Sequence, residues 1–260
     1  MKHYILSTLV FTPMLLHAQQ DIKSVLASIE RNNTTLQSSR ETMEAEKIAN
    51  RTGIYLANPE VEFGYLWGDP ASLGNRTDFS VTQSFDIATL SGLRSNAANE
   101  ENTLVEWQYK TDRMNILLEA KQYCIELVYY NALKEELEIR RQHAAMIAKG
   151  YEERLRQGDA SQLDYNKAKL NLSTAQGELT RVKVEQSALL EQLKRLNGGE
   201  PITLENVEFE PLLLPHRFDD WYQLAEERNP VLAYIRQQLE VQQKQVSLKK
   251  AMNLPTFTAG

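Results

Sequence analysis

The stretch RLRQGDASQLDYNKAK, residues 154–169, decides the fold of this chain. It interrupts a run over residues 93–197 that holds no proline and keeps a helical spacing of apolar residues on both sides. Gly158 can take the left-handed conformation that ends a helix. Ser161 can cap the next helix, with Asp164 three residues later as a variant capping box. We therefore expect two very long helices joined by a short polar turn.

The charges around this turn suit the ends of both helices. Asp159 and Asp164 lie at the start of the second helix, where the helix dipole favours acids, and Arg154 and Arg156 lie in the last turn of the first, where it favours bases. At 1.5 Å per residue, arms of about 60 and about 35 residues would reach roughly 90–100 Å and roughly 50 Å. All these features are typical of a stable helical hairpin, whether or not the turn has a further function.

Apolar or small residues recur every seven positions along both arms, a spacing typical of knobs-into-holes packing. Two interpretations remain open: a two-helix coiled coil, or helices flanked on both sides as in a barrel wall. The second arm favours the wall, because it carries two such stripes. The stripes are Leu104, Thr111, Leu118, Ile125, Ala132, Ile139 and Met146 in the first arm, and Ala168, Ala175, Val182, Leu189 and Leu196 with Leu172, Leu179 and Leu193 in the second.

Residues 58–90 change to a period of two. The stretches NPEVEFGYLWG (58–68) and RTDFSVTQSFDI (76–87) alternate apolar and polar residues around a turn-rich segment, which predicts a β-hairpin with strands of about ten residues. Such strands fit either a transmembrane barrel, with the apolar face toward lipid, or a half-buried hairpin in a soluble sheet. The apolar face comprises Val61, Phe63, Tyr65, Trp67, Phe79, Val81 and Phe85.

The N-terminal residues 1–18 predict an export signal. Lys2 precedes an apolar run that ends at a small residue, Ala18, the expected cleavage site; a buried N-terminal helix fits poorly because of Pro13. Residues 19–57 are then expected to form a helix to Leu56, broken at Asn32 and Asn33. No later segment has the roughly 20 apolar residues of a membrane helix. Any membrane crossing by the mature chain must therefore use strands.

The last part of the chain repeats the first. Residues 198–217 form a proline-containing connector, and residues 218–260 then match the beginning at a shift of 196 positions, so that Asn33 meets Asn229 and Pro59 meets Pro255. Both copies run helix, asparagine, helix, proline and strand opening. We therefore expect one structural repeat and the start of a second, that is, a truncated form of a longer protein.

The chain resembles the TolC family of outer-membrane efflux proteins. The features that carry the resemblance are, in order, the signal, the kinked helix, NPEVEFGY, QSFDI, SGLR, the long helical hairpin, RNPVL and LPTF. The resemblance implies a mainly α fold with a β-hairpin: a long coiled-coil helical hairpin, which is a segment of an α-barrel, plus transmembrane β-barrel strands. It also implies a homotrimer in outer-membrane lipid that extends into the periplasm. The partners implied are a periplasmic adaptor (membrane fusion) protein and an inner-membrane pump, and the implied function is passive export.

The same resemblance gives the turn a role. Gly158 and Asp164 match the family's tip glycine and its acidic position. The implied docking surface for the adaptor comprises Leu155, Arg156, Gly158, Ala160, Ser161 and Leu163. Asp164 and Arg154 would act in the gate that holds the periplasmic mouth shut.

Other classes of function find little support. We expect no catalytic residues, no metal site and no cofactor, because the four histidines, His3, His17, His143 and His216, lack ligand spacing and no phosphate loop or nucleophile elbow occurs. With a net charge of -6 and no basic cluster, nucleic-acid binding is not expected. A periplasmic adaptor and a structural coiled-coil protein of the envelope remain as rivals to the export conduit. Neither of them explains the alternating strands.

Overall fold

The structure is a computed structural model that describes residues 21–68, 72, 74–209, 211, 215 and 217–260. The signal peptide expected over residues 1–18 lies outside the described residues. The described residues divide into two units. One holds those within 21–28, 121–195 and 199–209, and the other holds those within 29–120, 196–198 and 211–260. Its elements in order are α1 (Ile22–Asn32), α2 (Thr34–Asn50), β1 (Glu60–Leu66), β2 (Arg76–Phe85), α3 (Ile87–Leu90), α4 (Leu93–Gln157), α5 (Gln162–Leu196), α6 (Phe218–Arg228), α7 (Pro230–Met252) and β3 (Phe257–Ala259).

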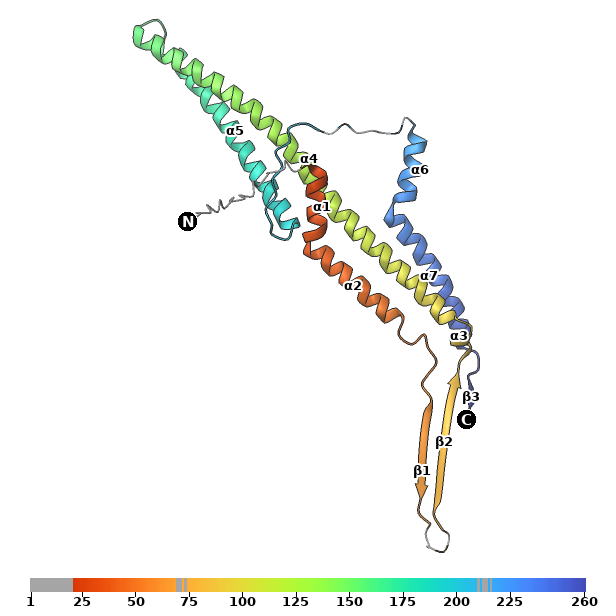
Figure 1. Cartoon of the computed structure of the whole chain (residues 1–260). Coiled ribbons are helices and arrows are strands. Elements are labelled where there is room, and N and C mark those ends of the chain that lie inside the picture. The colour runs from red at the N-terminus through yellow and green to blue at the C-terminus, as the bar shows by residue number, and fades with distance from the viewer. Residues whose placement is uncertain (1–20, 69–71, 73, 210, 212–214, 216) are drawn as a thin grey trace, which may run out of the picture. The chain divides into compact units, whose positions relative to one another are not determined.

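The first unit is the predicted helical hairpin. The 65-residue α4 is followed by the 35-residue α5, which runs back along the C-terminal half of α4 (Figure 1). The seam between them is apolar, with Leu137, Leu179 and Val182 buried and Tyr130 and Leu133 packed against them. The two long arms and the short turn between them are therefore confirmed.

The predicted seven-residue series is buried within this one chain on α5 but largely exposed on α4. Ala168, Ala175, Val182, Leu189 and Leu196 are all buried. On α4, Leu118, Ile125, Ile139 and Met146 are instead 40–65% exposed. The buried residues of α4 in this unit are instead Cys124, Leu127, Val128, Leu137, Ala144 and Ala148. More than one seven-residue series can be drawn along a long helix, and the spacing alone does not show which series faces the neighbouring helix.

Cys124 of α4 is fully buried. Burial raises the pKa of its thiol to about 12, so it remains protonated and unreactive at neutral pH.

In the second unit, α2 lies alongside the N-terminal half of α4 (Figure 1), and polar contacts join the two helices. Ser39 donates to Asp112 at 2.8 Å, Lys47 pairs with Glu106 at 2.7 Å, and Asn50 donates to Asn102 at 3.1 Å. Leu36 is the one buried residue reported for α2. The same long helix therefore has an apolar seam in one unit and a polar seam in the other.

The kink in the first helix forms at the predicted position, but the helix ends early. Asn33 separates α1 from α2 and caps α2, since its side chain accepts from the Leu36 N–H. The helix that was expected to reach Leu56 ends at Asn50. Three residues later, Gly53 adopts a left-handed conformation with φ of 75°, which a continuing helix excludes.

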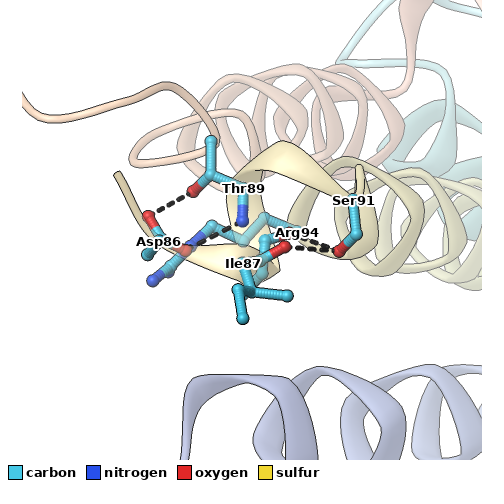
Figure 2. Close-up of polar contacts among 6 residues, drawn as sticks. Asp86, Ile87, Thr89, Ser91 and Arg94 are labelled. Atoms are coloured by element: carbon cyan, nitrogen blue, oxygen red, sulfur yellow. Dashed lines mark hydrogen bonds and ion pairs between the residues drawn. The ribbon is translucent and has the colours of Figure 1, made fainter. Parts of the chain in front are cut away.

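The β-hairpin is confirmed, with shorter strands than expected. β1 has seven residues and β2 has ten, and they pair antiparallel. The second strand was expected to continue to Ile87 but ends at Phe85. Asp86 turns the chain into α3, because its two carboxylate oxygens accept from the backbone N–H and hydroxyl of Thr89 at 2.8 and 2.7 Å. Figure 2 shows this turn, with Arg94 of α4 also reaching Asp86 at 3.4 Å.

The second copy of the repeat follows the order of the first. Asn229 separates α6 from α7 and caps α7, as Asn33 caps α2. β3 follows α7 after Pro255 and pairs antiparallel with β2, so the sheet has the order β1-β2-β3. The observed architecture is thus mainly α with a small, open antiparallel sheet.

Candidate functional site

The tip of the helical hairpin begins with a helix C-cap at Gly158. This residue has a φ of 83°, in the left-handed region. Its N–H donates to the Leu155 carbonyl at 3.1 Å, and the next N–H, of Asp159, donates to the Arg154 carbonyl at 2.8 Å. These two bonds define a Schellman motif, which satisfies the carbonyls at the end of α4. The conformation predicted for Gly158 is therefore confirmed.

Ser161 starts the second arm in the predicted way. The Asp164 N–H donates to the Ser161 Oγ at 3.1 Å, and the Ser161 hydroxyl donates to the Asp164 carboxylate at 2.6 Å. In a capping box, the acidic side chain accepts from the backbone N–H of the cap residue; here it accepts from the hydroxyl instead. The Ser161 hydroxyl lowers the pKa of Asp164 more than any other contact, which keeps this carboxylate ionised at neutral pH.

The predicted docking residues differ in how far they project from the turn. Leu163 is 62% exposed. Arg156, Gly158 and Ser161 are also exposed, whereas Leu155 and Ala160 are half-buried. One large apolar side chain therefore projects from the tip, on the first turn of α5.

The two predicted gate residues are not joined within the tip. Arg154 donates to the Asp159 carbonyl at 3.3 Å and lies over the ring of Tyr151, 5.5 Å from its centroid. Asp164 is engaged with Ser161. Among the described residues of this one chain, no hydrogen bond or ion pair links Arg154 to Asp164. At longer range, the charge of Arg154 contributes to the lowered pKa of Asp164.

The second candidate site is the apolar face of the hairpin. Phe63 lies opposite Phe79 and Val61 opposite Val81, so these side chains share one face of the sheet, while Glu62 lies opposite Ser80 on the other face. The register therefore places the two alternating patterns in phase. Exposed fractions on the apolar face are 65% for Val61, 67% for Phe63, 43% for Tyr65, 78% for Trp67, 68% for Phe79 and 46% for Val81, and Phe85 is half-buried.

One member of this face was not predicted. Phe257 of β3 lies opposite Phe85 and so extends the apolar face onto the third strand. The internal repeat contains the signal that would have found it, because a shift of 196 positions places Phe257 on Val61.

A third apolar surface runs along the outside of the helical hairpin. On α5, Leu163, Leu170 and Val184 are 62–68% exposed and follow a seven-residue spacing. On α4, Ile125, Ile139 and Met146 are also exposed and share that spacing. We call these two sets the outer stripes. The stripe on α4 belongs to a seven-residue series predicted from the sequence, whereas the stripe on α5 was not predicted. Each arm of the hairpin therefore has two apolar faces, of which one is covered.

Other kinds of site are not seen in the part of the chain that the structure describes. No group of three or more His, Cys, Asp or Glu side chains is placed to hold a metal ion among these residues. Within the same residues, every helix is too short or too polar to cross a membrane.

The chain is similar to several solved outer-membrane channels. It matches CusC, whose crystal structures concern folding and transmembrane channel formation, with a TM-score of 0.70 and 15% identity over 91% of this chain and 58% of CusC. It matches the outer membrane protein VceC of Vibrio cholerae with a TM-score of 0.66 and 17% identity, over 91% of this chain and 60% of VceC. It matches the Campylobacter jejuni CmeC outer membrane channel with a TM-score of 0.60 and 16% identity, over 91% of this chain and 54% of CmeC.

No family model matches the chain, and no curated protein matches it. The chain spans 54–60% of the length of the three channels named above. The similarity in structure shows that the chain has the fold of these channels. It confirms the mainly α part of the fold expected from the TolC resemblance, with long helices and a small sheet.

Proposed function

From this TolC-like fold, we propose that the chain forms part of the wall of an outer-membrane channel, a passive export conduit in a tripartite efflux or type I secretion system. The observation that carries the proposal is the similarity to outer-membrane channels over 91% of the chain. The one-sided apolar hairpin supports it, since a channel strand needs an apolar face toward lipid and a polar face toward the lumen.

The hairpin supplies the membrane-spanning part of this proposal. The ten residues of β2 fall within the roughly 9–11 that a transmembrane strand needs. Exposed Phe63 and Phe79 would face lipid, while Glu62 and Ser80, on the opposite face, would face water in the lumen. The protein would then lie in the outer membrane and extend into the periplasm.

The outer stripes offer surfaces through which several chains can associate. An exposed row of large apolar side chains on each arm is costly in water, and such patches mark interaction sites in soluble regions of proteins. Helices with two apolar faces suit a closed wall in which every helix has a neighbour on each side. We propose that neighbouring hairpins cover these stripes in a homotrimer.

The tip supplies the contact with the rest of the export system. We propose that a periplasmic adaptor, coupled to an inner-membrane pump, docks on Leu155, Arg156, Gly158, Ala160, Ser161 and Leu163. Gly158 leaves open space where a Cβ would stand, which permits a partner backbone to come close. Leu163 would enter an apolar hole between the adaptor's helices. Asp164 and Arg154 would form the gate with neighbouring chains.

A pair of substitutions tests the proposed function. Phe63→Lys places a charge on the apolar face, and Glu62→Lys places the same charge one residue away on the polar face. We expect Phe63→Lys to lose insertion into the outer membrane, because a lysine toward lipid at the midplane costs about 2–4 kcal/mol, and Glu62→Lys to insert normally. The measurement is the amount of protein in the outer-membrane fraction and the conductance of the purified protein in planar bilayers.

Three outcomes decide the matter. Loss of insertion for Phe63→Lys alone supports the channel. Equal behaviour of the two variants, with wild-type protein outside the membrane fraction, contradicts it and favours a periplasmic adaptor or a structural coiled coil. Membrane insertion without conductance contradicts the conduit.

A further inference from the structure

Residues 201–206, which we call the strap, cross the base of the helical hairpin in the first unit. Ile202 and Leu204 are buried, at 6% and 4% exposure, while Thr203 and Glu205 point outward. This alternation is that of an extended chain, yet the strap is not part of a strand. Its backbone groups therefore need partners other than a sheet.

One side chain of α4 provides partners for two of these groups. The amide nitrogen of Asn131 donates to the carbonyl oxygen of Leu204 at 2.8 Å and to that of Asn206 at 3.0 Å. Both hydrogens of a single side-chain amide are thus used by two carbonyls of the strap.

A side chain of α5 fixes the orientation of that amide. The amide nitrogen of Gln186, a residue only 9% exposed, donates to the Asn131 carbonyl oxygen at 2.7 Å. This bond requires the oxygen of Asn131 to face α5 and its nitrogen to face the strap. The amide pair therefore joins three segments, α4, α5 and the strap, at one point.

Apolar contacts alone would hold the strap without fixing the relative position of the two helices. Hydrogen bonds at 2.7–3.0 Å are directional, so a slide of α5 along α4 by one residue, about 1.5 Å, would break the Gln186 bond and leave the Asn131 amide free to turn away. An amide shielded from water is unfavourable without its partners. The amide pair is therefore a lock that resists sliding.

Solvent has a route to this lock. A cavity of about 430 Å³ lies beside it, lined by Asn131, Gln186 and strap residues and flanked by Lys134 and Lys183. If the strap lifts, water from this cavity can replace the two carbonyls and hydrate the amide pair. Release is therefore possible without unfolding of the hairpin.

We propose that the strap and the Asn131–Gln186 pair lock the register of α4 against α5, so that the hairpin repacks only after the strap is released. The lock itself stands on these contacts alone. Its consequence for opening of a channel rests on the proposed function.

Hydrogen exchange of the full-length protein tests the lock directly. Asn131→Leu removes both donors and puts an apolar side chain of similar size in their place, so Ile202 and Leu204 stay covered. We expect amide exchange over residues 200–207 to rise about tenfold or more, with α4 and α5 still protected elsewhere. The matched control is Asn115→Leu, an exposed asparagine on the same helix, which should leave the strap as in the wild type.

Gln186→Leu keeps the test decisive if Asn131→Leu prevents folding. It leaves the Asn131 donors in place but removes the bond that orients them, so exchange in the strap should again rise, by a smaller factor. Wild-type protection of residues 200–207 in a folded Asn131→Leu or Gln186→Leu protein would overturn the proposal, because it would mean that apolar burial alone holds the strap.

Planar-bilayer conductance separates this inference from the proposed function. If the wild type conducts, the Asn131→Leu protein should spend a larger fraction of time open, and an unchanged open fraction would refute the link between the lock and opening. If the wild type does not conduct while strap exchange rises as expected, the proposed function fails and the lock stands.

Discussion

The side-chain amide of Asn33 donates to the carbonyl of Leu196, the last residue of α5, at 2.8 Å, while its Oδ1 accepts from the Leu36 N–H at 2.9 Å. One residue thus closes the C-terminus of α5 and caps the N-terminus of α2. Asn33 is only 4% exposed, so water cannot readily replace either bond. The joint between these two helix ends depends on both halves of a single amide.

Asn33→Asp is expected to keep the cap and lose the bond to α5. The carboxylate still accepts from Leu36 but faces the Leu196 carbonyl without a donor, so we expect a loss of about 1–3 kcal/mol in the free energy of unfolding. Asn33→Ala should lose about 1 kcal/mol more, because the cap also goes. The measurement is denaturant unfolding followed by circular dichroism.

The internal repeat provides the control for this prediction. Asn229 caps α7 through its Oδ1 in the same way, and no acceptor for its amide nitrogen is found among the described residues. Asn229→Asp should therefore change the free energy of unfolding by less than about 0.5 kcal/mol. Equal losses for Asn33→Asp and Asn229→Asp would show that the bond to Leu196 contributes nothing.

Gly198→Ala and Gly199→Ala form a second matched pair. Both glycines have positive φ, of 68° and 93°. A Cβ on Gly198 would lie 2.4 Å from the carbonyl oxygen of Asn32, whereas a Cβ on Gly199 would meet nothing within 4 Å. Each alanine costs about 1 kcal/mol for the left-handed backbone, and Gly198→Ala should cost about 1–3 kcal/mol more because backbone must move.

Thermal unfolding of the two glycine variants checks this expectation. The Gly198→Ala protein should melt several degrees below the Gly199→Ala protein. Melting temperatures that agree within about one degree would mean that α1 and the end of α5 do not approach each other as closely as the structure shows.

The ion pair of Glu30 with Arg113 makes stability depend on pH. Two bonds of 2.7 Å join the side chains, and the bond to Arg113 lowers the pKa of Glu30 in the folded protein. A lowered folded pKa adds stability that is complete above the ordinary glutamate pKa and is lost as pH falls through the folded value. Both side chains are about two-fifths exposed, so we expect a contribution below about 1 kcal/mol.

Unfolding measured from pH 7 down to about pH 3 checks this sign. The Glu30→Gln protein should lose less stability than the wild type over the acid part of that range. Glu41→Gln is the control, because Glu41 is exposed and has no ion pair among the described residues. A wild-type and a Glu30→Gln protein with parallel pH profiles would refute the contribution of the pair.

Local sequence signals predicted where the two helices of the hairpin end and begin at the tip, but they did not predict the tertiary contacts. Gly158 and Ser161 act within one turn of chain, so their roles are readable from adjacent residues. The Asn131–Gln186 pair joins positions 55 residues apart, and each amide alone looks like an ordinary polar residue on a helix. The same holds for the α4 stripe, since only the position of α5 decides which seven-residue series it covers.

The repeat was the one long-range signal in the sequence. It predicted the helix break at Asn229 and the strand after Pro255, because the same order of elements occurs twice. It did not predict the end of α2 at Asn50, since the second copy runs to Met252 with a better helix-forming sequence. Where the two copies differ in sequence, the match in element order holds but the boundaries do not.

Asp164→Asn tests the proposed gate without disturbing the turn. The Asp164 backbone N–H still reaches the Ser161 Oγ, and an asparagine Oδ1 still accepts from the hydroxyl, so the cap survives while the negative charge is lost. The folded pKa of Asp164 lies below its ordinary value, so the wild-type carboxylate is charged at neutral pH and available to cations of neighbouring chains. If that charge holds the mouth shut, the variant should open more readily.

Asp159→Asn is the control for this last prediction, because it removes a charge of the same sign from the same turn. The Asp159 side chain is exposed and makes no hydrogen bond among the described residues. We expect Asp164→Asn to raise the open fraction in planar bilayers about tenfold and Asp159→Asn to leave it unchanged, with equal hydrogen exchange at both tips. An equal rise in both variants would mean that the charge of the whole turn matters rather than one latch. No rise in either would exclude Asp164 from the gate, while the hairpin turn that Gly158 and Ser161 form would be unaffected.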